Sequence, residues 1–206
     1  MEEKDFLKFR AELAEVMRGN RELCREGYVQ LWRAQDVAGV AAVVRHYWAE
    51  LNRRLWPEFQ QLLLSHYPKA EQAFNSHGIH YNTTCDSGLC VVDEHCESDC
   101  LVLKGKADAV VHGNAAVLLL DQAQATLLDS ARATAKDASS VFARGHSYVA
   151  AYGSSRIKAS DHARVVSDGA TDIYLYDYAQ LRPICYRRLD LGSNATLLGI
   201  NENWKA

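Results

Sequence analysis

The residues best suited to chemistry lie in a short acidic segment, residues 77–104, which holds four of the six cysteines. They are Cys85, Cys90, Cys96 and Cys100, with His95 among them. Thiolates and imidazoles are the ligands of structural zinc sites, but the usual zinc motifs present cysteine pairs separated by two residues. The turn-forming residues 86–88 also predict a hairpin, in which the cysteines would be small, half-buried residues. Zinc therefore stays one alternative, and disulfides are less favoured in a cytoplasmic chain.

Familiar catalytic motifs are missing from the sequence. It contains no His-Glu-x-x-His, Gly-x-Ser-x-Gly, Walker or Gly-x-Gly-x-x-Gly pattern. Calcium-binding β-rolls share the corner aspartates described below, but they need denser glycine and a nine-residue period. We therefore expect neither an enzyme nor a resident cofactor.

The composition is that of an ordinary foldable chain. Of its 206 residues, 48% are apolar and 24% are charged, which excludes disorder over most of the length. A net charge of −3 gives no reason to expect a nucleic-acid partner. No apolar run approaches the roughly 18 residues of a membrane span, and the charged start, residues 1–5, is followed by no apolar signal core. We therefore expect a cytoplasmic protein.

Residues 1–76 carry the period of amphipathic helices. Phe6, Phe9, Leu13 and Val16 step by three, four and three residues, which places them on one helical stripe. Asp36 is placed to cap a later helix, in which Val40, Val43, Tyr47 and Leu51 share a face. These stripes predict a small domain of four or five short helices that pack on one another.

An eight-residue repeat dominates residues 105–184. In all ten units the first residue is Gly or Asp, the third is Ala, Ser or Thr, and the fifth is Ala, Val, Ile or Leu. Inward residues at every second position indicate short strands, and Gly or Asp indicates a turn between them. Strands joined only by corners form a β-solenoid, in which each coil pairs with the next.

The outward residues bear on the number of sides. A three-sided coil would hold 24 residues, giving about three coils, and it would separate a polar row from two apolar or aromatic rows. A two-sided coil would instead place Thr126, Phe142, Lys158 and Tyr174 in one mixed row. Because separated rows are the simpler arrangement, we favour three sides.

Two surfaces of such a solenoid stand out. Leu118, Phe142 and Val166 would form an apolar face, which either packs against the helices or serves as an interface. Tyr148, Tyr152, Tyr174 and Tyr176 would lie together on another face. Tyrosine is common on exposed strands, but it also offers a large contact area with a polar tip to a protein or a sugar.

The segment GHSYVAAYGSSRIKA, residues 145–159, resembles the uncharacterised octapeptide-repeat proteins of bacterial and phage genomes. Some of these proteins also have a helical amino-terminal part and an Asn-x-x-Gly-Ile-x-x-Asn element, which residues 75–82 match. The resemblance implies a repeat architecture, and it implies no activity, ligand or catalytic residue.

Together these observations predict an α+β protein in four parts. They are a helical domain (1–76), a connector with the first coil (77–104), the octapeptide-repeat solenoid (105–184) and a carboxyl-terminal cap (185–206). We expect an interaction or scaffold protein that binds a protein partner, or a second copy of itself, through a solenoid face. The alternatives are a carbohydrate-binding or carbohydrate-active protein, which would use the tyrosines with Asp168 and Asp172, and a zinc-stabilised module.

Overall fold

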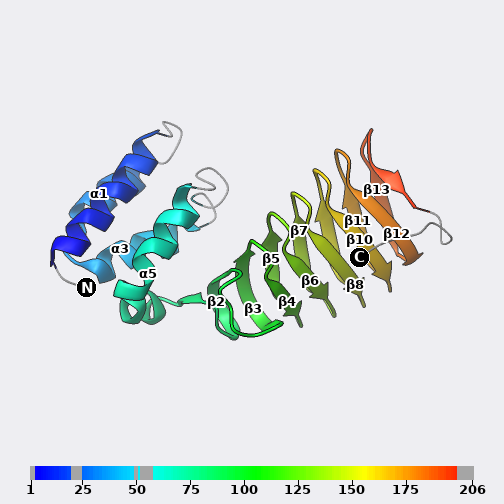
Figure 1. The fold of residues 1–206 in the computed structure, drawn as a ribbon, viewed down its shortest axis with the longest axis horizontal. Coiled ribbons are helices and arrows are strands. Elements are labelled where there is room, and N and C mark those ends of the chain that lie inside the picture. The colour runs from blue at the N-terminus through cyan, green and yellow to red at the C-terminus, as the bar shows by residue number, and fades with distance from the viewer. Residues whose placement is uncertain (1–2, 20–24, 49–50, 52–57, 199–206) are drawn as a thin grey trace. The chain divides into compact units, whose positions relative to one another are not determined.

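The computed structural model describes residues 3–19, 25–48, 51 and 58–198 (Figure 1). The chain divides into two compact units, Met1–His80 and Tyr81–Ala206, and each is described separately. Cys24 and the end of the expected carboxyl-terminal cap, residues 199–206, lie outside the described residues.

The first unit is helical. Its described helices are α1 (Glu3–Gly19), α2 (Arg25–Arg33), α3 (Val37–His46) and α5 (Glu58–Ser76). Phe9, Leu13 and Phe74 are fully buried between them, whereas Val16 of the predicted stripe is only half-buried. The predicted cap of α3 is confirmed, because the Asp36 side chain accepts a hydrogen bond of 2.8 Å from the Gly39 amide.

The second unit is a parallel β-solenoid of about seven turns. The division between the units falls within the short strand β1 (Ile79–Tyr81). The strands that follow are β2 (Cys85–Val92), β3 (Leu101–Val111), β4 (Ala116–Leu119), β5 (Gln124–Leu127), β6 (Arg132–Ala135), β7 (Ser140–Ala143), β8 (Tyr148–Tyr152), β9 (Arg156–Ala159), β10 (Arg164–Asp168), β11 (Asp172–Leu175), β12 (Gln180–Cys185), β13 (Arg188–Leu191) and β14 (Thr196–Leu197). The predicted α+β class, a helical part followed by a β-solenoid, is confirmed.

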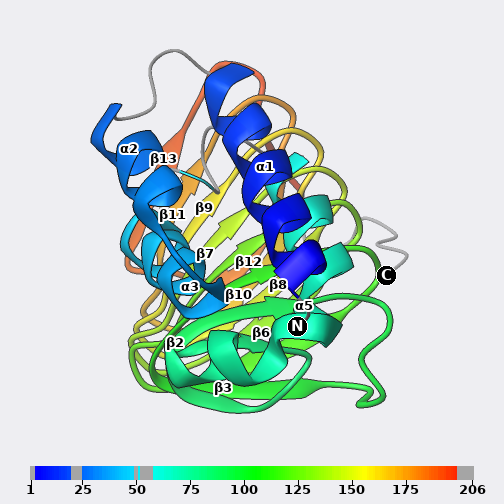
Figure 2. The same ribbon diagram turned by 90° about the vertical axis from the view of Figure 1, so that its left-hand side faces the viewer.

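The solenoid has two sides and about seven turns, so the expectation of three sides and about three coils was wrong. Strands pair with the strand two further along the chain, so Thr126 lies beside Phe142 and Phe142 beside Lys158, sixteen residues apart. We call β5, β7, β9, β11 and β13 sheet A, and β4, β6, β8, β10, β12 and β14 sheet B. Strand β3 contributes to both sheets, because Leu101–Leu103 pair with β4 and Asp108–Val111 pair with β5. Figure 2 shows the coils of this unit one behind another.

Small inward side chains explain the two-sided coil. Most of the third, fifth and seventh positions of the repeat are fully buried, as in Ala123, Ala125 and Leu127 of one side. Alanine and serine leave space only for two sheets that face each other at close range, while the larger Val, Ile and Leu fill the gaps between them. A triangular interior would need larger residues at these positions.

The corners are held by a repeated hydrogen bond between coils. Asp121, Asp129 and Asp161 have positive φ angles of 54–57°, a conformation that aspartate tolerates. The Asp121 carboxylate accepts a hydrogen bond of 3.1 Å from the Gly105 amide, one coil earlier, and Asp161 accepts one of 3.0 Å from Gly145. Gly105 itself needs to be glycine, because a Cβ there would lie 2.3 Å from the carbonyl oxygen of Asp86.

A buried aspartate fixes the first coil. Asp93 accepts hydrogen bonds from the Tyr81 hydroxyl (2.7 Å), the Asn82 side chain (2.8 Å) and the His95 amide (3.0 Å), and its own amide donates to Asn82. Burial raises the pKa of Asp93, but the hydrogen bonds outweigh it and hold the pKa below its usual value. Burial and the hydrogen bond to Asp93 raise the pKa of Tyr81.

Candidate functional site

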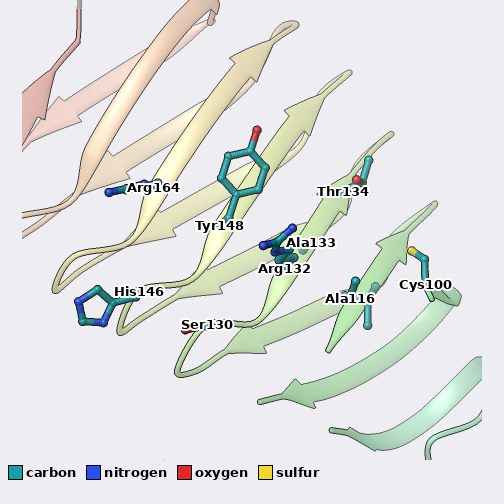
Figure 3. Close-up of a pocket in the computed structure, with 10 residues that line it drawn as sticks. Cys100, Ala116, Ser130, Arg132, Ala133, Thr134, His146, Tyr148 and Arg164 are labelled. Atoms are coloured by element: carbon teal, nitrogen blue, oxygen red, sulfur yellow. The ribbon is translucent and has the colours of Figure 1, made fainter. Parts of the chain in front are cut away.

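The outer surface of sheet B carries a groove of about 410 Å³ (Figure 3). Arg132, Tyr148 and Arg164 occupy equivalent positions on β6, β8 and β10, since the register pairs Arg132 with Tyr148 and Tyr148 with Arg164. Ala116 and Cys100 extend the groove toward β4 and the start of β3. The other residues that line it are mostly small, so Arg132, Tyr148 and Arg164 are its largest side chains.

The groove is positively charged. Two of its ten lining residues are arginines, and none is an aspartate or a glutamate. Burial, followed by the nearby Tyr152 hydroxyl, raises the pKa of Tyr148, whereas the charges of Arg132 and Arg182 act in the opposite direction. The Tyr148 ring therefore lies half-buried between guanidinium groups, where it presents an apolar face and a neutral hydroxyl.

A row of stacked rings begins at the corner beside this groove. The imidazoles of His146 and His162 lie with ring centroids 5.3 Å apart and an interplanar angle of 20°. The ring of Tyr178 continues the row, 5.5 Å from His162 and at 15° to it. His146 also lines the groove, so the row extends the same surface along the corner.

Sheet A carries a second groove, of about 430 Å³, with a different lining. Its residues are Gln122, Gln124, Ala138, Ser140, Ser154, Arg156, Asp172 and Arg187. Asp172 accepts a hydrogen bond of 2.8 Å from the Arg187 Nε and pairs with the other arm of the same guanidinium. The Arg187 hydrogen bond holds the pKa of Asp172 below its usual value, and the charges of Arg156 and Arg188 lower it further.

The four predicted tyrosines do not form one surface, which corrects the three-sided interpretation. Tyr148 and Tyr152 lie on β8 of sheet B, whereas Tyr174 lies on β11 of sheet A and Tyr176 directly follows it. Only Tyr148 lines the groove of sheet B. The reason is the sixteen-residue coil, which places positions 24 residues apart on opposite sheets. Asp168 and Asp172 are likewise separated by a corner, between β10 and β11.

The predicted apolar face is divided in the same way. Leu118 and Val166 belong to one row of sheet B, with Thr134 and Ala150 between them. Phe142 lies on sheet A, next to Thr126 and Lys158. The three residues therefore do not form a continuous apolar patch.

The predicted zinc ligands do not assemble into a site. Cys85 and Cys90 are buried and belong to the core of the first coil, whereas Cys100 and His95 are exposed. Cys96 is partly buried against that core. Among the described residues, no group of three His, Cys, Asp or Glu side chains could hold a metal ion. Burial raises the pKa of the Cys90 thiol to about 12, with a smaller contribution from Cys85.

Sequence reasoning did not single out Arg164, His146, His162 or Tyr178. The fourth position of every second repeat unit gives the series Ala116, Arg132, Tyr148, Arg164 and Gln180, which is the groove row. The signal was therefore present, but it could be read only after the coil length was known.

No family model, curated protein or solved structure matches the chain. Within the part of the chain that the structure describes, no helix combines the length and the apolar character needed to cross a bilayer.

Proposed function

We propose that the protein is a non-enzymatic interaction protein that binds an acidic segment of a partner protein along the outer face of sheet B. The observation that carries this proposal is the placement of Arg132, Tyr148 and Arg164 in one row of a groove without acidic residues.

The chemistry of this row suits carboxylates. The planar guanidinium of arginine donates two parallel hydrogen bonds to a carboxylate, and such charge-assisted pairs are the stronger ones in proteins. Tyr148, between Arg132 and Arg164, supplies contact area at a low cost in conformational entropy. The row is therefore suited to a ligand that alternates charge with apolar surface.

The spacing favours a chain over a single ion. Arg132 and Arg164 are separated by two strand spacings, or about 10 Å along the solenoid axis. A segment with several Asp or Glu residues can offer a separate carboxylate to each arginine along this span, which a single ion cannot do. The stacked rings of His146, His162 and Tyr178 lengthen the surface in the same direction.

Two further assignments belong to this proposal. The described cysteines are all free thiols, which supports a reducing compartment and hence the cytoplasm. A helical part followed by a solenoid supports the likeness to the octapeptide-repeat proteins of bacterial and phage genomes.

Fluorescence anisotropy with a labelled octaglutamate peptide tests the proposal. We expect the peptide to bind the wild-type protein, and we expect Arg164→Gln to weaken binding by about tenfold, the value of one charge-assisted pair. The matched control is Arg156→Gln, the same change on sheet A, which should leave the affinity within about twofold. Octaglutamine, which has the same length and no charge, should not bind.

Two results would overturn the assignment. One is a wild-type protein that fails to bind octaglutamate at about 1 mM, the weak limit for a specific contact. The other is an equal loss of affinity in Arg164→Gln and Arg156→Gln, which would show that net charge, and not the groove, attracts the peptide.

A further inference from the structure

The groove of sheet A differs in kind from the groove of sheet B and is not used by the function proposed above. Its hydrogen-bonding residues stand in two adjacent rows. Gln124, Ser140 and Arg156 occupy equivalent positions on β5, β7 and β9, followed by Asp172 on β11. Gln122 and Ser154 come two residues before Gln124 and Arg156 and line the same groove.

Amide and hydroxyl side chains dominate this surface. Each can both donate and accept a hydrogen bond, so the rows of Gln122, Gln124, Ser140 and Ser154 match a ligand that presents many hydroxyl groups. Along the row of Gln124, Ser140 and Arg156 the groups recur at the strand spacing of about 5 Å, whereas in the other row Ala138 separates Gln122 from Ser154. Ala138 contributes only a methyl group, which leaves space between the larger side chains.

An exposed aromatic ring lies next to these rows. Phe142 follows Ser140 by two residues on β7, so both side chains point outward from the same face. The Phe142 side chain is 40% exposed, a large fraction for an apolar ring. A ring beside hydroxyl-binding groups offers a platform for the apolar C–H face of a sugar.

One end of the groove carries excess positive charge. Asp172 is buried and its carboxylate is paired with Arg187, while the charges of Arg156 and Arg188 also act on it. One carboxylate therefore faces three guanidinium groups. Because Asp172 is already paired with Arg187, no other carboxylate among the lining residues of this groove pairs with Arg156.

We infer that the groove of sheet A is a second binding site, which takes an oligosaccharide bearing carboxylate groups. The hydroxyl groups of the sugar bind the glutamines and serines, a sugar ring packs on Phe142, and a carboxylate binds Arg156. A scaffold with this site joins a glycan on one sheet to an acidic protein segment on the other.

Isothermal titration calorimetry with two oligosaccharides of equal length tests this inference. Tetragalacturonate carries a carboxylate on every sugar, and maltotetraose carries none. We expect tetragalacturonate to bind the wild-type protein at least about tenfold more tightly than maltotetraose. Arg156→Gln should remove most of that difference, and Phe142→Ala should weaken both sugars.

Lys136→Gln, which removes a positive charge at an exposed residue that lines neither groove, is the control and should leave sugar binding within about twofold. The inference is overturned if tetragalacturonate does not bind the wild-type protein, or if Arg156→Gln and Lys136→Gln weaken its binding equally. Octaglutamate binding to sheet B is measured separately on the same variants, so failure at one groove is distinguished from failure at the other. Unchanged circular dichroism of each variant excludes misfolding as the cause.

Discussion

The corner aspartates allow a quantitative test of what stabilises the solenoid. Asp121 has a φ angle of 57° and accepts a hydrogen bond of 3.1 Å from the Gly105 amide in the preceding coil. Alanine at position 121 would lose this bond, worth about 1 kcal/mol, and would adopt a left-handed conformation that costs about 1–2 kcal/mol. We therefore expect Asp121→Ala to lower the free energy of unfolding by about 2–3 kcal/mol.

Two further substitutions at Asp121 separate the hydrogen bond from the backbone conformation. Asp121→Gly loses the hydrogen bond but accepts the positive φ angle, so it should cost only about 1 kcal/mol. Asp121→Asn keeps a side-chain oxygen and tolerates the same conformation, so it should cost less than about 0.5 kcal/mol. This ranking would explain why no corner of the repeat begins with alanine.

Urea unfolding, followed by far-ultraviolet circular dichroism at a wavelength dominated by strands, provides the measurement. Glu97→Ala, in the exposed segment before β3, removes the same charge away from any corner and serves as the control. If Asp121→Ala is as stable as Asp121→Gly, backbone strain is not what selects the corner residues. If Asp121→Asn is as unstable as Asp121→Ala, the side-chain hydrogen bond contributes nothing.

Three further predictions concern buried groups of the solenoid. The pKa of Asp93 is lower in the folded state than its ordinary value of 3.8, so ionised Asp93 stabilises the fold above pH 3.8, and this stabilisation is lost as the pH falls below that value. In urea titrations at several pH values, Asp93→Asn should therefore lose less stability in acid than the wild type. The buried Ser147 hydroxyl has no hydrogen-bond partner among the described residues, so Ser147→Ala should leave the free energy of unfolding unchanged or raise it by up to about 1 kcal/mol. A fall in the free energy of unfolding by more than about 1 kcal/mol would contradict this prediction. Cys90, buried and with its pKa raised to about 12, should react with iodoacetamide far more slowly than the exposed Cys185, which mass spectrometry of timed samples would show.

Much of the architecture followed from the sequence because it depends on local rules. Small and branched residues at every second position predicted inward-facing strands, and Val141, Val149 and Ile157 are indeed buried. The cap at Asp36 depends only on residues three positions apart, so it too could be predicted. The solenoid was therefore recognisable without any long-range information.

The number of sides could not be derived in the same way, because it depends on how far apart the walls pack. The structure contains the mixed row of Thr126, Phe142, Lys158 and Tyr174 that a two-sided coil predicts. Outward residues are exposed to solvent, and nothing requires a row of them to be uniform. The abundance of alanine at the inward positions was the better guide, since it limits the interior to two closely packed sheets.

The candidate grooves depend on the same long-range fact. Arg132 and Arg164 are 32 residues apart in the sequence, and only the pairing of β6, β8 and β10 brings them to one row. Arg187 lies beyond the regular repeat and reaches Asp172 from the next coil, where it directly precedes β13. Neither relation follows from a motif.

The sixteen-residue coil also constrains how this chain can change length. Loss of sixteen residues would remove one coil, that is, one strand from each sheet. Each remaining residue would stay on its own sheet, and each row of outward residues would be one residue shorter. Loss of eight residues would move every later unit to the opposite sheet, so that Arg164 would join sheet A and Arg156 would join sheet B, depending on the point of deletion. The eight-residue unit is thus the repeat that is visible in the sequence, whereas insertion and deletion can preserve both surfaces only in steps of two units.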